Sequence, residues 1–545
     1  MTTVFEVLTP ASLRRDGDPQ RRCTFLIAAS SGFPLAGLLF VGAYSAANRG
    51  AGYAHELFWA AVVLALCTTA VVLGLAENKR RAAAVLTVSL AVLLSLPKYL
   101  RAPGYFNFYD ELAHWRAAQD LLEGHRLLAP NSLNKVVADY PGLAALSAAT
   151  AAATGSPVFA AGNIVILVAR ACGCLAMFLL AERIVRAPAA ALLAAVIFMA
   201  NPAFMFFDAQ FAYESLALPL VTVVLLLAMR VVPSDSAHRT PLLIAALLLA
   251  GAVVITHHSS SYLLTALLLA TAVVAYVLRR PPSAQLLVLA AVTFAGTVTW
   301  LFTVARYTLT YVGPYVRSNL ASVPDFLTGS GKPRQLFGGF PLPPLYEQVA
   351  GYVAVIVLMM LAAPGFWWLR RARPHRDRVA MWVLALLGSL YFLSLPMVAL
   401  RGDQTAKRVW EFAFIGLGPA CALTLWLMTV RGRVVWRWIA PTLLVIVFVG
   451  SGVARSGEHI RFPGPYAPSA DPRSMTPDVV AAARWLDTER GPDHRVVGDR
   501  TLAAAMGSYG EQVAVTYQED GRPVWKILEP DTLTDGVAKE VRGSR

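Results

Sequence analysis

The feature of this sequence that most constrains its fold is a series of long apolar runs. Between Cys23 and Arg455, runs of about 18 to 22 mostly apolar residues recur, and each is long enough to cross about 30 Å of hydrocarbon as a helix. Only 15% of the 545 residues are charged, whereas a soluble domain has roughly 25%. The sequence therefore predicts an α-helical polytopic membrane protein.

We count about thirteen predicted transmembrane helices. They run over 23–46, 57–76, 82–100, 158–181, 188–205, 214–229, 241–256, 259–278, 284–304, 347–369, 379–400, 409–430 and 437–454. The tail before the first run is polar, and no small-residue cleavage signal follows a short apolar core. We therefore interpret the first run as an anchor rather than a signal peptide.

The distribution of Lys and Arg predicts the orientation, because short cytoplasmic loops carry an excess of these residues. Basic residues fall in every second connection, at Arg14, Arg15, Arg21, Arg22, Lys79, Arg80, Arg81, Arg183, Arg186, Arg230, Arg239, Arg279, Arg280, 370–378, Arg431, Arg433 and Arg437. We expect a multi-pass protein of the plasma membrane with a cytoplasmic N-terminus and an extracytoplasmic C-terminus. Topology then explains most of the net charge of +14, and no nucleic-acid partner is expected.

This topology divides the chain into three parts. Residues 1–22 form a cytoplasmic tail, residues 23–454 form the membrane domain, and residues 455–545 form a small extracytoplasmic α/β domain. The long external loops are 101–157 and 305–346. The five cysteines lie in or beside apolar runs, so no disulfide framework or zinc site is indicated.

Two secondary-structure predictions concern the external parts. The last fifteen or so residues of 101–157 are apolar but too short for a span, so we expect a half-inserted or amphipathic helix on the outer face. In the tail, "PDVVAAARWLDTER" and "TLAAAMGSYG" predict helices, whereas "RVVGD", "QVAVTYQ" and "PVWKILE" predict strands. The tail has fewer than about 70 ordered residues, so we expect it to lean on the membrane domain.

The motif "YDELAHW" follows an apolar run directly and places two carboxylates one helical turn from a histidine. Asp110 and His114 are four residues apart and Glu111 and His114 three, so the side chains share one flank of a helix. They are candidates for acid–base chemistry. The alternative is a structural one, a juxtamembrane helix with acidic residues in its first turn.

A second acidic segment lies at 201–220, "NPAFMFFDAQFAYESLALPL", which has no Lys or Arg. It places Asp208 and Glu214 among aromatic residues at the membrane surface, where carboxylates are costly unless they are paired, bind a metal or face an aqueous cavity. The alternative is an interfacial aromatic belt with solvated acids. Two acidic external loops on one face favour a shared site.

The turn "THHSSSY" joins two apolar helices and carries His257 and His258. These imidazoles are candidates to bind a metal ion or a phosphate. The alternative is a helix cap in which Ser259 or Ser260 is the N-cap residue.

The segment "RGDQTAKRVWEFAF" (401–414) is a short external loop that breaks the charge rule. Lys407 and Arg408 on this side are candidates to bind an anion, although solvated charges would also be tolerated there. Further basic residues in the 305–346 loop add to the same potential, namely Arg306, Arg317, Lys332 and Arg334. Arg170 lies near the middle of a span and is expected to face the bundle interior or to pair with an acid.

A basic, aromatic and carboxylate-bearing cavity on the outer face suits one chemistry particularly well. A sugar on a polyprenyl phosphate already has a good leaving group, so an enzyme needs a carboxylate to deprotonate an acceptor hydroxyl and cations to hold the departing phosphate. A nucleotide-binding glycine loop is not required for this reaction, and the sequence contains no such motif.

The motifs resemble those of the glycosyltransferase C (GT-C) superfamily, which includes protein O-mannosyltransferases and the aminoarabinose transferases that act on lipid A. The similarity rests on "YDELAHWRAAQDLLEGHRLLAP" with "ADYPGL" in the first external loop, and on "MANPAFMFFDAQ" in the second. It is strongest over about 82–230. It implies a GT-C-like membrane domain and a hexosyl- or pentosyltransferase.

The resemblance also implies roles for individual residues. Asp110 would be the general base, or Glu111 if the register differs by one residue, and Asp208 would assist or help to bind a metal. The other expected residues are Lys407, Arg408, His257, His258 and Arg317 for the donor phosphate, and His114, Tyr140 and Glu214 for the acceptor or for positioning. The cofactor is not identified, and a divalent cation is one option.

The expected partners are a polyprenyl-phosphate sugar donor, membrane lipid, and an extracytoplasmic glycan, lipid or protein acceptor. The alternative classes are a secondary transporter, a lipid-linked-glycan flippase, and a wall-polymer ligase or polymerase. Transporters favour ionisable residues near the membrane midplane, whereas most ionisable residues here lie at the outer ends of spans. A scaffold without catalytic activity would not explain why acids and cations converge.

Overall fold

The computed structural model describes residues 19–515. The positions excepted within that range are 77, 132, 232–235, 280–283, 322–327, 329–341, 373–377, 400–402, 432–434, 467–471 and 499. Lys332, Arg334 and the predicted strand "PVWKILE" lie outside the described residues.

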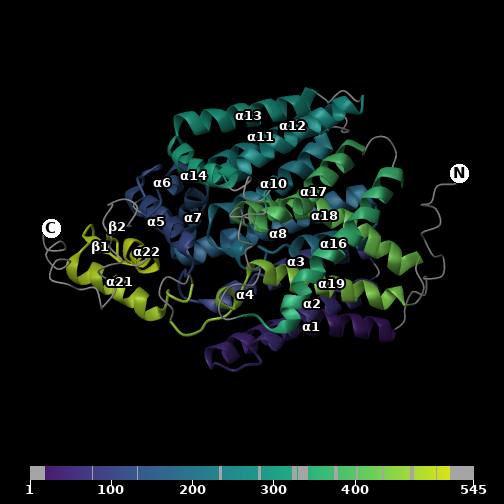
Figure 1. Ribbon diagram of the computed structural model, residues 1–545, viewed down its shortest axis with the longest axis horizontal. Coiled ribbons are helices and arrows are strands. Elements are labelled where there is room, and N and C mark those ends of the chain that lie inside the picture. Colours follow the sequence, from purple (N-terminus) through teal and green to yellow (C-terminus); the bar gives the residue numbers. More distant parts are fainter. Residues whose placement is uncertain are drawn as a thin grey trace.

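The membrane domain is a bundle of long helices that run between two opposite ends (Figure 1). Within the described part of the chain, eleven helices are long and apolar enough to cross a membrane. They are α2 (Ala54–Leu75), α3 with α4 (Lys79–Leu93 and Leu96–Arg101), α8 (Val158–Val185), α10 (Tyr213–Val231), α11 (Ser236–Thr256), α12 (His258–Val277), α13 (Ala284–Thr303), α16 (Leu345–Ala372), α17 (Arg378–Ala399), α18 (Asp403–Arg431) and α19 (Trp436–Arg455). The polytopic fold predicted from the apolar runs is confirmed.

The first and fifth predicted spans differ from the other eleven. The first predicted span lies within α1 (Pro19–Asn48), whose side chains are described only from residue 31 onward. The fifth, 188–205, is wrong over its last third, because α9 (Pro188–Met199) has only 12 residues. Asn201 stops the helix: its side-chain oxygen accepts the N–H of Ala203 at 2.8 Å, and the next residue, Pro202, disfavours helical backbone before it.

The chain after α9 is irregular up to α10, apart from a 3₁₀ turn, η3 (Phe207–Ala209). Most side chains of the segment 200–212 are nevertheless buried. Backbone without helical hydrogen bonds is tolerated at membrane depth only where protein or a water-filled cavity surrounds it. The interior of the bundle therefore contains an irregular segment that carries Asp208.

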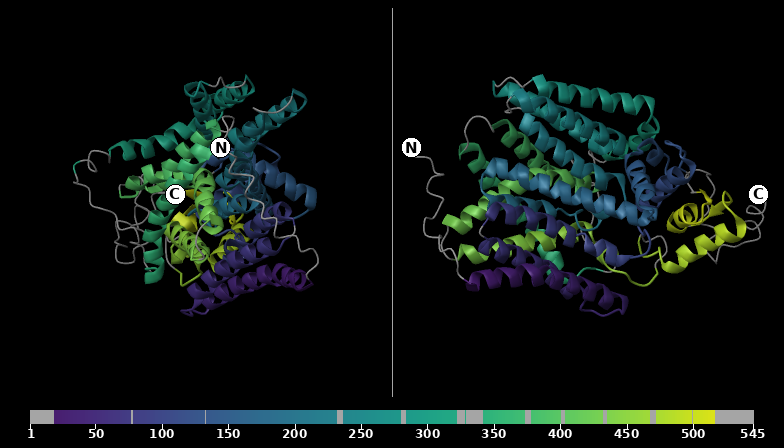
Figure 2. Two further views of the ribbon diagram at one scale, coloured as in Figure 1. Left: turned by 90° about the vertical axis from the view of Figure 1, so that its right-hand side faces the viewer. Right: turned by 180° about the vertical axis from the view of Figure 1, so that it is seen from behind.

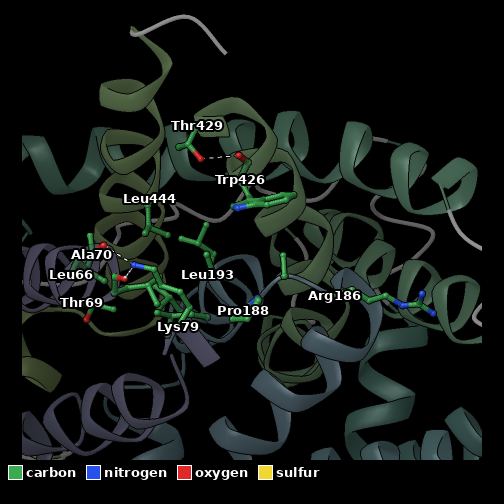
Figure 3. Close-up of a pocket in the computed structure, with 16 residues that line it drawn as sticks. Leu66, Thr69, Ala70, Lys79, Arg186, Pro188, Leu193, Trp426, Thr429 and Leu444 are labelled. Atoms are coloured by element: carbon green, nitrogen blue, oxygen red, sulfur yellow. Dashed lines mark hydrogen bonds between the residues drawn. The ribbon is translucent and has the colours of Figure 1, made fainter. Parts of the chain in front are cut away.

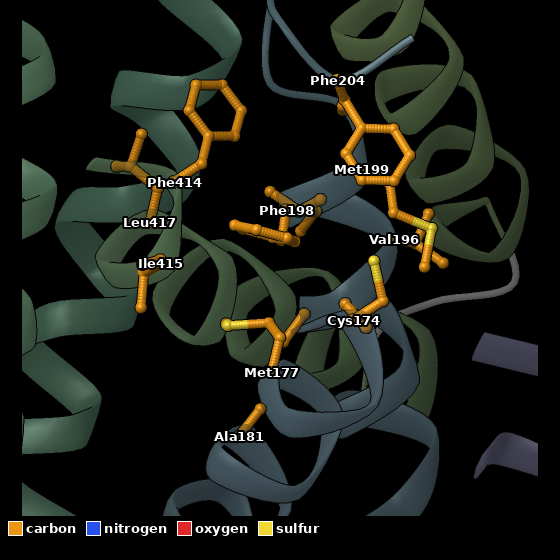
Figure 4. Close-up of a cluster of buried hydrophobic side chains, with 14 of the residues drawn as sticks. Cys174, Met177, Ala181, Val196, Phe198, Met199, Phe204, Phe414, Ile415 and Leu417 are labelled. Carbon is orange, nitrogen blue, oxygen red and sulfur yellow. The ribbon is translucent and has the colours of Figure 1, made fainter. Parts of the chain in front are cut away.

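The core of the bundle is formed where α8, α9 and α18 meet. Figure 4 shows Met177 from α8, Phe198 from α9 and Phe414 from α18 in one buried cluster. Nearby, α17 and α18 approach so closely that a Cβ atom on Gly416 would lie 2.2 Å from the carbonyl oxygen of Leu384. Small residues at such crossings let helix backbones pack closely in a membrane.

Short helices cover one end of the bundle, which we call the site end. They are α5 (Tyr109–Gly124), α6 (Lys135–Asp139), α7 (Gly142–Thr154) and α14 (Tyr307–Ala321). Helix α7 is the short apolar helix predicted near the end of the 101–157 loop, and it buries a stripe that includes Leu143, Ser147 and Ala151. Because α8 starts beside α7, its last residue, Val185, lies at the opposite end.

The C-terminal part of the chain forms a small unit next to α5 (Figure 2). It contains α21 (Pro477–Arg490), β1 (Arg495–Val497), α22 (Arg500–Ser508) and β2 (Val513–Val515). The two strands are parallel, with Arg495 opposite Val513. The two predicted helices and the first two predicted strands correspond to these elements.

Polar contacts attach this unit and the linker before it to the bundle. The N–H of Phe106 donates to the Tyr509 hydroxyl at 2.8 Å. In the linker, α20 (Glu458–Arg461) ends at Arg461, which is fully buried and pairs with Glu347 of α16 at 2.5 Å. Trp59 of α2 donates to the same carboxylate at 2.7 Å. The C-terminal unit therefore packs against the membrane domain, as expected from its small size.

Candidate functional site

Glu111 and Lys98 form a buried ion pair at the start of α5. The Glu111 carboxylate also accepts the N–H groups of Asn107 and Phe108, both at 3.2 Å, and that of Phe211 at 2.8 Å. A carboxylate at the third helical position that bonds back to the chain before the helix is the acidic half of a capping box. Glu111 thus holds three segments together, and its oxygens are already occupied.

Asp110, the preceding residue, has a different environment. Its side chain is half-buried, and the structure gives it no hydrogen bond or ion pair to any described residue. It lies within electrostatic range of the Tyr213 phenol. Of the two adjacent carboxylates, Asp110 is the one whose oxygens remain available to another molecule.

Tyr213, the first residue of α10, is the centre of a group of rings that we call the aromatic cluster. Its other members come from α5, from the α6–α7 connection and from the start of α12: His114, Tyr140, His257 and His258. The Tyr213 ring centroid lies 4.4 Å from His114 and His257, 5.8 Å from His258 and 6.5 Å from Tyr140. The cluster therefore unites residues from three segments that the sequence analysis considered separately.

Burial disfavours the charged form of two imidazoles of this cluster, His114 and His257. It lowers the pKa of His114 to about 3. It also lowers the pKa of His257 well below its ordinary value, with smaller contributions from the neighbouring His258 and His114. His114 Nε2 accepts the N–H of Tyr213 at 3.4 Å, and His257 Nδ1 lies 2.8 Å from Ser260 Oγ. The cluster thus offers polar, uncharged ring edges.

The turn at His257 differs from the capped turn considered from sequence. Helix α12 begins at His258, its N-cap residue is His257, and no side chain in the described part of the chain caps it. Ser260 bonds to the His257 ring instead. The Nδ1 atom of His258 is buried and has no hydrogen-bond partner among the described residues, an arrangement that costs free energy unless water or a ligand satisfies it.

A second group of side chains, which we call the arginine cluster, lies against the same end of α10. Arg408 pairs with Glu214, and Arg455 pairs with Glu411. The two guanidiniums face the ring of Phe207, at 5.0 and 3.7 Å from its centroid. Since Glu214 follows Tyr213 directly, the arginine cluster and the aromatic cluster adjoin.

Asp208 completes the arginine cluster. It is 3% exposed, and its Oδ2 accepts from Asn201 at 3.4 Å while Oδ1 has no hydrogen-bond partner among the described residues. Burial, followed by the negative charge of Glu411, raises the pKa of Asp208 to about 7, although Arg455 and Arg170 oppose the shift. Asp208 was expected at the membrane surface, but it is an interior group.

Lys407 and Arg317, two other basic candidates, are less buried than Asp208. Lys407 and Arg408 lie in the second turn of α18, not in a loop, because this helix begins at Asp403. The main-chain oxygen of Lys407 accepts from Arg455 at 3.2 Å. Arg317 of α14 is exposed and lines a cavity of about 480 Å³ together with Tyr262 and Thr308.

That cavity adjoins the aromatic cluster. The ring of Tyr262 lies 6.3 Å from that of His258, and Thr308 donates to the Tyr140 hydroxyl at 3.4 Å. Its other walls are apolar side chains of α13 and α14. A mostly apolar cavity with one arginine thus lies beside the polar, aromatic cluster.

Five further residues belong to the site although they were not expected from the sequence: Lys98, Tyr213, Glu411, Arg455 and Tyr262. Glu411 lies three residues after Arg408 in "KRVWEF", so that motif contained a signal for it. Arg455 was assigned only as the start of the tail. Arg170 is buried as expected and donates to Phe204 O at 2.6 Å. Within the described ranges, no group of three or more His, Cys, Asp or Glu side chains is placed to hold a metal ion.

Comparison with solved structures identifies the fold. The chain is similar to the oligosaccharyltransferase of Archaeoglobus fulgidus, solved with a tethered acceptor peptide, at a TM-score of 0.52 and 12% identity over 81% of this chain. It is similar to ArnT from Cupriavidus metallidurans, solved with bound undecaprenyl phosphate, at a TM-score of 0.50 and 13% identity over 83% of this chain and 88% of that one. The chain spans 64% of the length of the oligosaccharyltransferase.

These likenesses show that the chain has the GT-C fold, as the resemblance of its loop motifs predicted. No protein-family model matches the sequence, and no curated protein matches it.

Proposed function

We propose that this protein is a membrane glycosyltransferase that transfers a sugar from a polyprenyl-phosphate donor to a hydroxyl group of an extracytoplasmic glycan, lipid or protein. The observation that carries the proposal is the position of Asp110, a half-buried carboxylate without a hydrogen-bond or ion-pair partner among the described residues. It lies beside an aromatic cluster that adjoins two arginines, in a GT-C fold. Fold alone does not define an activity, so the proposal rests on the site.

In the proposed reaction, Asp110 is the general base. It accepts the proton of the acceptor hydroxyl as the oxygen attacks the anomeric carbon of the sugar. The bond between that carbon and the phosphate oxygen breaks, and the polyprenyl phosphate leaves with the electron pair. General-base catalysis of this kind contributes roughly 10²- to 10⁴-fold in rate.

The donor phosphate is assigned to Arg408 and Arg455, with Lys407 beside them. Arginine suits this role, because its planar guanidinium binds phosphate through two parallel hydrogen bonds and keeps its charge when buried. Phosphate would compete with Glu214 and Glu411 for these guanidiniums. A partly protonated Asp208 lowers the negative charge that the phosphate meets there.

His257 and His258 have a different proposed role from the one expected of them. A neutral buried imidazole supplies no positive charge to a phosphate, so we assign His257 and His258, with His114 and Tyr140, to hydrogen bonding and ring stacking with the sugar or the acceptor. Arg317 stays a candidate for the donor because it lines the cavity beside Tyr262. Glu111 positions α5 and does not react.

The orientation and the location belong to the same proposal. We assign the site end to the extracytoplasmic side of the plasma membrane, with the N-terminus in the cytoplasm. This assignment makes the basic short connections cytoplasmic and brings the site to the leaflet where a flipped lipid-linked donor meets its acceptor.

The test is a comparison of lipid-linked sugars and surface glycans in cells without the gene, with the wild-type gene, and with an Asp110→Asn variant. The proposal predicts that the first and third strains accumulate the same polyprenyl-phosphate sugar and lack the same glycan residue. If the protein is a transporter or a flippase, Asp110 has no catalytic role. The Asp110→Asn variant would then restore the wild-type pattern of lipid-linked sugars and surface glycans.

A further inference from the structure

A second cavity lies at the opposite end of the bundle from the aromatic and arginine clusters. Its volume is about 660 Å³, which is within the 300–1,000 Å³ typical of small-molecule sites. It is bounded by the end of α2, the start of α3, the α8–α9 connection with α9, the end of α18 and a residue of α19 (Figure 3). The proposed transfer reaction does not use this cavity.

The walls of the cavity are apolar and deep. They include Leu66 and Leu73 of α2, Leu193 and Val196 of α9, and Trp426 of α18. From Leu73 back to Leu66, and from Pro188 on to Val196, the walls extend about 10–12 Å along each helix at 1.5 Å per residue. The cavity therefore reaches from the helix ends into one leaflet of a bilayer about 30 Å thick.

The mouth of the cavity is basic. Among the described residues that line it, two are basic, Lys79 and Arg186, and none is acidic. The Lys79 ammonium donates to the carbonyl oxygens of Leu73 and Gly74, both at 2.6 Å, which fixes its position at the end of α2. Arg186 is exposed and extends outward from the α8–α9 connection.

We propose that this cavity binds one anionic glycerophospholipid, with its phosphate head group at the mouth that carries Lys79 and Arg186 and an acyl chain along the apolar walls. Basic mouths of pockets between transmembrane helices suit anionic head groups. Because the acyl chain comes from an environment that is already apolar, the walls favour it through van der Waals contacts. The bound lipid would connect α2, α9 and α18, and so would stabilise the bundle at the end where no surface helix of the site covers it.

The experiment uses the full-length protein in detergent, titrated with phosphatidylglycerol or with phosphatidylcholine of the same acyl chains and observed by native mass spectrometry. The proposal predicts one retained phosphatidylglycerol and at least tenfold weaker retention of phosphatidylcholine. Equal binding of the two lipids would overturn the assignment of an anionic head group.

Variants test the position of the lipid. Lys79→Gln and Arg186→Gln should each weaken phosphatidylglycerol binding about fivefold, because one cation near a membrane surface contributes about that much. Leu193→Trp should fill the cavity and abolish specific binding. The matched control is Arg378→Gln, which removes an exposed cation of α17 outside the cavity and should bind as the wild type does.

Thermal unfolding before lipid is added identifies any of the three cavity variants that has not folded. Lipid binding is then compared for the remaining variants. Undiminished phosphatidylglycerol binding by the folded Lys79→Gln, Arg186→Gln or Leu193→Trp protein would overturn the proposal. None of these readouts depends on sugar transfer, so this inference and the proposed function fail independently.

Discussion

The carboxylate of Glu111 accepts the backbone N–H of Phe211 at 2.8 Å, and this bond joins α5 to the buried segment 200–212. It brings the helix that carries Asp110 against the segment that carries Asp208. The ion pair between Glu111 and Lys98 connects α4 to the same place. The acidic motifs that carry Asp110 and Asp208 therefore lie side by side, and the Glu111 carboxylate holds them together.

This relationship predicts that Glu111→Gln acts mainly on stability. The change leaves the buried Lys98 ammonium without its partner, and breaking a buried pair from one side typically costs about 3–5 kcal/mol. Thermal unfolding of the purified protein should show a clear loss for Glu111→Gln and almost none for Asp110→Asn. The double variant Lys98→Met with Glu111→Gln should recover part of the loss. Equal stability of wild type and Glu111→Gln would contradict this role for the carboxylate.

The arginine cluster predicts a defect in donor use. Arg408→Gln should raise the KM for the polyprenyl-phosphate donor roughly 10- to 100-fold, the range for one charged hydrogen bond. Because Arg408 pairs with the buried Glu214, the companion variant Arg408→Gln with Glu214→Gln avoids an unpaired carboxylate and should show the same KM defect. Arg126→Gln removes an exposed cation at the same end and is the control. An unchanged donor KM in both cluster variants would exclude Arg408 and direct attention to Arg317.

The raised pKa of Asp208 predicts a pH-dependent contribution to stability. The folded carboxyl keeps its proton up to about pH 7, whereas the unfolded chain releases it near pH 3.8. The folded state therefore binds more protons between these values, and stability falls as pH rises through this window. The Tm difference between wild type and Asp208→Asn should shift in favour of the Asn variant from pH 4.5 to 7.5. A difference that is flat, or that shifts the other way, would contradict an interior protonated Asp208.

The orientation is tested by cysteine labelling in intact cells, in a background in which the five native cysteines are replaced. Leu127 follows α5 at the site end and is 60% exposed, so Leu127→Cys should react with a membrane-impermeant maleimide. Arg378 begins α17 at the other end and is exposed, so Arg378→Cys should react only after the membrane is permeabilised. The reverse pattern would place the site in the cytoplasm.

Much of the fold is encoded locally, and so the sequence predicts it. Apolar runs long enough to span a bilayer predict the eleven long helices, and "PDVVAAARWLDTER" matches α21 from end to end. The prediction is wrong at α9, where apolar residues continue past the point at which Asn201 and Pro202 end the helix. Hydropathy responds to composition and misses that backbone signal.

The site was only partly predictable, for a physical reason. Asp110 and His114 share a helix, so their spacing predicts that they lie together. The pairing of Arg408 with Glu214, and of Arg455 with Glu411, depends on how α18 packs against α10 and α19. The distinction between Asp110 and Glu111 depends on Lys98 and Phe211, which approach only in the folded chain. No local pattern contains that information.

The proposed role of Asp110 as the general base can be tested by the rate of sugar transfer. The rate of sugar transfer from the polyprenyl-phosphate donor is compared in membranes that contain equal amounts of wild type, Asp110→Asn and Asp120→Asn. Asp120 lies on the same helix and pairs with Arg116 at 2.6 Å, so it controls for the loss of a carboxylate from α5. We predict that Asp110→Asn lowers the rate roughly 10²- to 10⁴-fold while Asp120→Asn stays near the wild-type rate. An Asp110→Asn protein that transfers sugar at the wild-type rate would rule out Asp110 as the general base.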